Sequence, residues 1–334
     1  MKKIINDPYA VVDETISGIL KAYPYHLRMS AESGRALVRA DAPVKGKVGI
    51  CTGGGSGHIP VFLGYVGPGL LDGVSVGNVF SSPSADDMLA ATKEVNGGAG
   101  VLYVFGNYSG DTMNFEMAAE MADMEDIEVQ MSIVSDDVAS APRNEKEKRR
   151  GVAGLVFAYK LAGAKAATMA TLNEVKAVAD RAIEETCSIG VALSPCTIPA
   201  AGKPTFTIAD DEMEIGMGIH GEPGLQRSKM MPANDIAEAM TDKVIIDLPF
   251  NQGDEVAVLV NGLGATPPEE LFILYNRIHD VLGEHGLNVW KTYVGEYATS
   301  MEMAGASLTL IRLNEEFKTL LDAPAFSPFL PQWK

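Results

Sequence analysis

Short apolar runs alternate with amphipathic stretches along most of the chain. The runs at residues 47–51 and 100–105 each lead into a glycine-rich turn, which predicts two strands that end at such turns. Residues 152–163 and 171–185 have apolar positions at helical spacing and predict helices. Strands interleaved with helices are typical of an α/β fold.

The same alternation continues to the end of the sequence. Further strands are predicted at residues 127–134, 189–193, 212–217, 255–260, 288–294 and 307–313, with an amphipathic helix that ends near residue 283. A chain of 334 residues exceeds what one core usually supports. We therefore predict two α/β domains, each a mixed or mostly parallel sheet covered by helices: domain 1–186 with the GGGSGH and NYSGD loops, and domain 187–334 with the GIHGEPG loop.

Two polar or amphipathic segments of the first domain have a simple structural interpretation. Methionines recur at helical spacing after residue 111 and predict a buried helix face: Met113, Met117, Met121 and Met124. The charged run PRNEKEKRR, within residues 136–150, predicts a solvated surface loop.

Composition and charge exclude several classes of protein. Apolar residues make up 46% of the chain and charged residues 21%, which is typical of a folded globular protein. The net charge of −17 repels nucleic acid and anionic membranes, and we expect neither as a partner. The N-terminus does not resemble a signal peptide, and no run approaches the length of a membrane helix. Three scattered cysteines indicate reduced thiols, so we expect a cytoplasmic protein.

Common nucleotide and metal motifs are absent from the sequence. No G-x-x-x-x-G-K-[ST] occurs, and no H-E-x-x-H or paired-cysteine spacing indicates a bound metal. Gly216, Gly218 and Gly221 match G-x-G-x-x-G, but Pro223 and Gly224 follow and break the helix that a pyrophosphate requires. We interpret this match as coincidental.

Three glycine-rich loops carry the candidate chemistry. The first, TGGGSGHIP at residues 52–60, can present backbone N–H groups to a small polar ligand beside Ser56 and His58. A turn that merely tolerates glycine is the alternative, which four glycines in five positions disfavour. The second, GNYSGD, ends in Asp111, which stands where an N-cap would lie. Spacing alone favours equally a helix cap and a functional role, either as a general base or as a hydrogen-bond partner of a substrate hydroxyl.

The third loop, GMGIHGEPG, contains His220 between flexible neighbours. A neutral imidazole there is a candidate general base, ligand or nucleophile. The alternative interpretation is a histidine in a surface loop that has no function. His26, His279 and His285 lie in helical or connecting stretches, where we expect no functional role.

The ordered motifs TGGGSGH, GNYSGD, RRGVAG, ADDEMEIGMGIHGEPG and AVLVNGLGATP resemble the substrate-binding K subunit of the dihydroxyacetone kinases. This resemblance extends from Ile4 through LLDAPAFSPF near the C-terminus. It implies two α/β domains in a homodimer and a histidine, here His220, that captures a ketose carbonyl as a covalent hemiaminal. It also implies that His58 and Asp111 flank the hydroxyl that is phosphorylated.

The resemblance further implies that substrate is bound by Gly55, Ser56, Gly57, His58, Gly106, Asp111 and His220, without a metal. No cofactor is expected on this chain; ADP or ATP with Mg²⁺ is expected on an L-type nucleotide-binding partner subunit, with a phosphorelay M-type subunit as a further candidate. Ile59 and Gly106 stand where the family commonly has glutamate and lysine. These departures favour a longer ketose, such as a tetrulose, beside dihydroxyacetone. The alternative function is a ketose sensor that acts as coactivator of a transcription factor.

Overall fold

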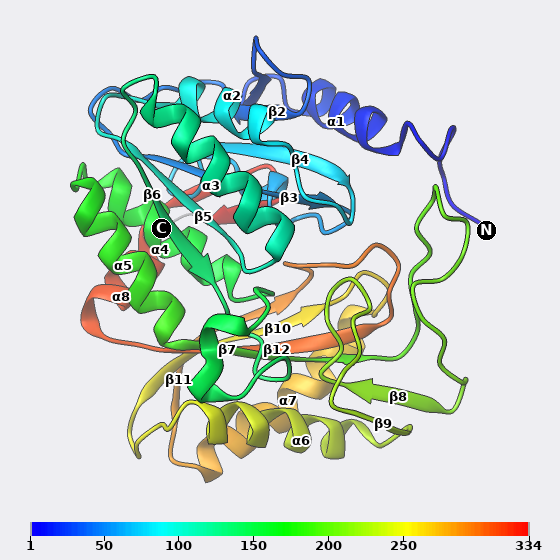
Figure 1. Cartoon of the computed structure of the whole chain (residues 1–334). Coiled ribbons are helices and arrows are strands. Elements are labelled where there is room, and N and C mark those ends of the chain that lie inside the picture. The colour runs from blue at the N-terminus through cyan, green and yellow to red at the C-terminus, as the bar shows by residue number, and fades with distance from the viewer. Residues whose placement is uncertain (1, 333–334) are drawn as a thin grey trace.

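The computed structural model describes residues 2–332 and contains two six-stranded sheets, one above the other in Figure 1. The strands of the first sheet, in spatial order, are β1 (Leu27–Met29), β2 (Ala36–Arg39), β4 (Gly73–Val79), β3 (Gly49–Ser56), β5 (Val101–Gly106) and β6 (Val129–Val134). The last four are parallel, and β1 and β2 are antiparallel additions at one edge. β3, β5 and β6 confirm predicted strands, whereas β2 and β4 were not predicted.

Helices cover both faces of this sheet: α1 (Val11–Ala22), α2 (Ala85–Val95), α3 (Ser109–Asp123), α4 (Leu155–Ala167) and α5 (Leu172–Glu184), with short 3₁₀ turns η1 (Leu63–Tyr65) and η2 (Arg143–Lys148). Their starts follow local sequence signals. The Ser84 hydroxyl accepts the Asp87 N–H at the start of α2, and Thr171 and Glu174 form a capping box at the start of α5.

The second sheet is also mixed. Its strands, in spatial order, are β11 (Asn288–Gly295), β10 (Glu255–Gly262), β12 (Gly305–Arg312), β7 (Thr186–Ala192), β8 (Glu212–Ile215) and β9 (Gln226–Lys229). Only the pair β10 and β11 is parallel. The helices α6 (Ala233–Asp247) and α7 (Pro268–Glu284) pack against it, as Figure 1 shows below the sheet. The predicted mixed α/β architecture is therefore confirmed.

The chain returns to the first sheet after β12. Helix α8 (Glu315–Asp322) packs against α4, and the small sheet of β13 (Ala325–Ser327) and β14 (Leu330–Gln332) follows. Helix α4 is buried on nearly all sides, because it packs against β3, β5, α5 and α8. The buried core beside the first sheet thus includes C-terminal residues such as those of α8, and the domain boundary near residue 187 stays a prediction.

The predicted methionine face of α3 is wrong. Met113, Met117 and Met124 are 65%, 52% and 77% exposed. The buried side chains of this helix include Phe115 and Ala118, which lie between the methionines in the sequence. Two sets of residues at helical spacing are therefore possible buried faces of α3, and the face with Phe115, Ala118 and Ala122 is the buried one.

The charged loop is not simply solvated either. The Arg149 side chain is 1% exposed and donates two hydrogen bonds to the carboxylate of Asp247, at 2.8 and 2.6 Å. Arg150 is also largely buried and pairs with Asp137. Neither Asp247 nor Asp137 belongs to the segment PRNEKEKRR. The composition of that segment alone therefore predicts solvent exposure and not buried ion pairs.

Within residues 2–332, no helix is sufficiently long and apolar to cross a membrane. The same residues contain no group of three or more histidine, cysteine or acidic side chains that could hold a metal ion. Cys51, Cys187 and Cys196 are free thiols and buried.

Candidate active site

The three glycine-rich loops meet at one place, although they come from both sheets. The first begins inside β3, which continues through Ser56 and pairs there with β4, so the turn predicted over its first glycines is wrong and the loop itself starts at Gly57. The second follows β5, the parallel strand next to β3, and the carboxyl ends of both strands lie at the same edge. The third follows β8 of the second sheet, where the glycine-rich turn continues without a helix, as the sequence predicted. Ring contacts between His58 and His220, with centroids 4.8 Å apart, join the two halves of the site.

His58 is almost fully buried and has a defined tautomer. Its Nδ1 lies 2.7 Å from the carbonyl oxygen of Thr299, and because a carbonyl only accepts hydrogen bonds, Nδ1 carries the proton. Nε2 is then a lone-pair acceptor, and it has no protein partner. Burial, followed by the nearby charge of His220, lowers the pKa of His58 to about 3, so the imidazole is neutral.

Asp111 is a buried carboxylate in the first turn of α3. The helix begins at Ser109, and Tyr108 is its N-cap residue, so the predicted N-cap position of Asp111 is wrong. Its Oδ1 is buried without a hydrogen-bond partner. Burial raises the pKa of Asp111 to about 6, against the opposing effects of Ser82 and His220. Such a carboxyl has the protonation range of a general base.

His220 is fixed by its neighbour Glu222. Nδ1 of His220 donates to Oε1 of Glu222 at 2.9 Å, and the backbone N–H of His220 donates to Oε2 at 2.9 Å. Burial acts to raise the pKa of Glu222, but the hydrogen bond and charge of His220 outweigh it and lower that pKa to about 2. In the neutral imidazole this hydrogen bond places the proton on Nδ1, so the lone pair lies on Nε2.

Aromatic rings surround the His220 imidazole on several sides. The rings of Phe80 and Tyr108 lie edge-on to it, with centroids 5.2 and 4.9 Å away, and His58 is the third ring. Tyr108 and Glu222 stand inside the motifs that the sequence singled out, but only their neighbours were selected. Phe80 has no signal in the sequence; its positive φ of 56° and its stacking on His58 are visible only in the structure.

The small residues of the predicted binding set allow close packing around the loops. Gly57 has a φ of 103°, and a Cβ there would lie 2.7 Å from the Phe80 ring. A Cβ at Gly55 would lie 2.6 Å from the backbone nitrogen of Ser81. The Ser56 hydroxyl donates to the carbonyl of Gly77 at 2.9 Å, and this hydrogen bond connects β3 with β4.

Gly106 is enclosed by its surroundings. A Cβ at this position would lie 3.2 Å from the carbonyl oxygen of Gly151 and 3.4 Å from the Tyr108 ring. A longer side chain at residue 106 therefore requires the Tyr108 ring to shift, and that ring is one of those around His220.

Unsatisfied polar atoms mark the same region. Among residues 2–332, the buried side-chain oxygen and nitrogen atoms without a hydrogen-bond partner belong to His58, Tyr108, Asp111 and Thr112. Each such atom lowers stability by about 1–3 kcal/mol when left unpaired. Their concentration beside His220 indicates a site that a polar ligand completes.

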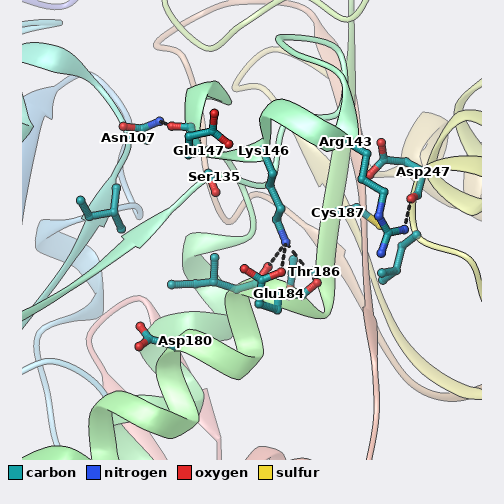
Figure 2. Close-up of a pocket in the computed structure, with 13 residues that line it drawn as sticks. Asn107, Ser135, Arg143, Lys146, Glu147, Asp180, Glu184, Thr186, Cys187 and Asp247 are labelled. Carbon is teal, nitrogen blue, oxygen red and sulfur yellow. Dashed lines mark hydrogen bonds and ion pairs between the residues drawn. The ribbon is translucent and has the colours of Figure 1, made fainter.

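Two cavities are each lined in part by residues of these loops. A largely apolar one of about 210 Å³ is lined by residues 54–59, α1 and Thr299. Another, of about 560 Å³, is lined by Asn107 and η2, and Figure 2 shows its charged side chains: Lys146 donates to the carbonyls of Ile183 and Glu184 at the end of α5. That second cavity contains none of the predicted site residues, so we place the candidate chemistry at His220.

Comparison with known proteins agrees with this geometry. Residues 17–329 match the Dak1 domain family. The chain is 45% identical over 316 residues to the dihydroxyacetone-binding subunit DhaK of the PTS-dependent dihydroxyacetone kinase 1 of Listeria innocua, with 95% of each chain covered. The chain belongs to the Dak1 family, and with this subunit it shares nearly its full length.

Two further relatives differ in what their names describe. A D-erythrulose kinase of Mycolicibacterium smegmatis is 42% identical over 328 residues; 98% of this chain matches 56% of that protein. The solved structure of a dihydroxyacetone kinase operon co-activator, DhaQ, has a TM-score of 0.87 and 32% identity, and covers 94% of this chain and 96% of its own. The family therefore contains both kinases and a co-activator on this fold.

Proposed function

We propose that this chain is the ketose-binding subunit of a kinase and that it captures its substrate covalently on His220. The observation that carries the proposal is the meeting of His220 with two buried acid–base side chains, His58 and Asp111, whose free acceptor atoms have no protein partner. The high identity to a dihydroxyacetone-binding kinase subunit over nearly the full length supports the same assignment.

Capture uses the lone pair of Nε2. Nε2 of His220 attacks the ketose carbonyl carbon, the carbon–oxygen π bond opens, and the oxygen takes up a proton to become a hydroxyl. The Nδ1–H bond breaks and its proton moves, by way of solvent, to the former carbonyl oxygen, so the adduct is a neutral hemiaminal; Glu222 orients the ring for the attack through its hydrogen bond to Nδ1. A short ketose offers little surface for noncovalent binding, and a covalent bond overcomes this limit.

Phosphoryl transfer then requires a base beside the terminal hydroxyl. Asp111, with a pKa of about 6, is the stronger candidate, because the pKa of His58 near 3 makes its imidazole a weak base. His58 Nε2 is suited to accept a hydrogen bond from the substrate hydroxyl and to orient it. Gly55, Ser56, Gly57 and Gly106 complete the proposed binding set.

A four-carbon ketose is the proposed substrate beside dihydroxyacetone. Gly106 carries no side chain next to the Tyr108 ring, and Ile59 brings no carboxylate to the loop. The similarity to a D-erythrulose kinase supports this extension. ADP or ATP with Mg²⁺ is proposed to bind to an L-type partner subunit, where ATP is the phosphoryl donor and a phosphorelay M-type subunit is a further candidate that would convert bound ADP to ATP. A homodimer in the cytoplasm completes the proposed assembly.

A ketose sensor is the second candidate function, supported by the similarity to the DhaQ co-activator. Sensing requires capture by His220 but no base. The buried, unpartnered Asp111 therefore favours the enzyme.

The test of capture uses intact-protein mass spectrometry after incubation with dihydroxyacetone or erythrulose. We expect an adduct with the full mass of the ketose, because addition to a carbonyl releases no water. The adduct should be absent in His220→Ala and retained in the surface control His279→Ala, which lies on α7. Saturable binding without any adduct in the unmodified protein would contradict the proposal.

A further inference from the structure

Arg150 lies behind the site and reaches the loop of His220. Its Nε donates to Oδ2 of Asp137 at 2.8 Å, and its Nη2 donates to the carbonyl oxygen of Gly216 at 3.1 Å. The Asp137 side chain is 3% exposed, so this pair is shielded from water. Asp137 and Arg150 come after β6 of the first sheet, whereas Gly216 directly follows β8 of the second sheet. The arginine thus joins the two halves of the site.

The same guanidinium also faces Glu222. Nη1 of Arg150 lies 3.9 Å from Oε2 of Glu222, and the other carboxylate oxygen holds Nδ1 of His220 at 2.9 Å. Four charged or titratable groups therefore follow one another from Asp137 through Arg150 and Glu222 to the His220 ring. The last group of this series, the His220 ring, contacts the rings of His58 and Tyr108 in the candidate active site.

Gly218 has no side chain, and this allows Arg150 and Glu222 to approach each other. A Cβ at residue 218 would overlap both Oε2 of Glu222 and Nη1 of Arg150. The backbone of Gly218 does not have the positive φ that favours glycine, unlike Gly216 and Gly221. Its lack of a side chain is therefore explained by the arginine–glutamate approach and not by a backbone conformation.

We propose that Arg150 is a positioning residue for His220. It holds Glu222 in place so that the carboxylate fixes the imidazole with its proton on Nδ1 and with Nε2 directed to the substrate. The functional consequence rests on the proposed capture by His220. A misplacement of about 1 Å at a reacting group changes rates by roughly 100-fold. Arg150 acts through Glu222 and does not touch the ketose itself.

The experiment compares Arg150→Gln, Arg150→Lys and the matched control Arg149→Gln. Arg149 is the preceding residue and equally engaged with a carboxylate, that of Asp247, but it makes no contact with the His220 loop. The ¹³C NMR spectrum of [2-¹³C]dihydroxyacetone measures the ketone and hemiaminal fractions. The ¹⁵N NMR spectrum of the imidazoles, with His220 assigned by its loss in His220→Ala, reports which ring nitrogen carries the proton.

We expect Arg150→Gln to weaken capture by about 10- to 100-fold and to give His220 a mixture of both tautomers. Arg150→Lys should recover part of the capture, because it restores the charge without the paired hydrogen bonds. Arg149→Gln should lower thermal stability but leave both spectra of the folded protein unchanged. Wild-type capture and an unchanged tautomer in Arg150→Gln would overturn the proposal.

Gly218→Ala provides a second route that leaves the arginine in place. The added methyl group should separate Arg150 from Glu222 and reproduce the loss of capture and the mixed tautomer; an unaltered tautomer in this variant would also count against the proposal. The two hypotheses fail in different ways. If the unmodified protein formed no adduct, the proposed function would fail, while the ¹⁵N tautomer would still test the role of Arg150.

Discussion

Replacing Asp111 by asparagine should make the protein more stable and less active. The carboxyl is buried, its Oδ1 has no partner, and its pKa is raised from 3.8 to about 6. Between these pH values the folded state holds a proton that the unfolded state has released, so stability falls as the pH rises through this window. Above about pH 6 the full destabilisation remains.

The magnitude follows from the same shift. A change from 3.8 to about 6 corresponds to an upper limit of about 3 kcal/mol. Asparagine carries no charge to bury, so Asp111→Asn should raise the free energy of unfolding at neutral pH by about 1–3 kcal/mol. Loss of a general base should reduce phosphoryl transfer by about 10²-fold or more and leave ketose capture intact.

Three measurements check this prediction: urea unfolding at neutral and acidic pH, the mass of the ketose adduct, and transfer from ATP in the presence of a nucleotide-binding partner subunit. Asp123→Asn is the matched control, because Asp123 is exposed on the same helix. Full transfer activity in Asp111→Asn would refute the assignment of the base. A loss of stability at neutral pH would refute the argument that burial raises the pKa. In the unmodified enzyme, transfer should rise with pH through about 6.

Two further predictions concern specificity and the pH dependence of stability. Gly106→Lys should lower the ratio of kcat/KM for erythrulose over dihydroxyacetone by roughly tenfold, because the new side chain must share space with the Tyr108 ring; a wild-type enzyme that already prefers dihydroxyacetone would contradict the reasoning. Burial, with a smaller contribution from Lys291, lowers the pKa of Lys160 from 10.5 to about 8, so the free energy of unfolding should rise as the pH increases between these values. Lys160→Met should abolish this rise in urea titrations, and parallel pH curves for the two proteins would show the idea to be wrong.

The sequence predicted most strands and loops of the site because glycine-rich segments follow short apolar runs, but it ended β3 too early, since the strand continues through Ser56. It also selected His58 and His220, since each stands within such a turn. The predicted order of motifs could not show that Glu222 holds His220, because a two-residue separation in a loop does not define side-chain direction. Phe80 could not be found at all, since it is brought to His58 by the pairing of β3 with β4.

The wrong predictions have physical causes in tertiary packing. On α3 both the methionines and the stripe with Phe115 and Ala118 have helical spacing, and only the sheet beneath decides which one is buried. In the charged loop, Arg149 and Arg150 find carboxylates at Asp247 and Asp137, which lie outside the run. The density of charges along the sequence does not show which carboxylate each arginine pairs with in the folded protein. The N-cap of α3 is Tyr108, three residues before the predicted cap Asp111, so Asp111 is a buried acid in the first turn of the helix.

The return of the chain to the first sheet constrains the order in which the protein can be assembled during translation. Phe317 and Leu321 of α8 belong to the same buried cluster as Leu37, and the Ser327 hydroxyl donates to the carbonyl of Gly64. The apolar core of the N-terminal half can therefore be completed only after residues 315–327 have left the ribosome. The second sheet, whose core lies between residues 187 and 310, can form while that half is still open. Nascent chains should consequently expose an incomplete N-terminal core until residues 315–327 have been synthesised.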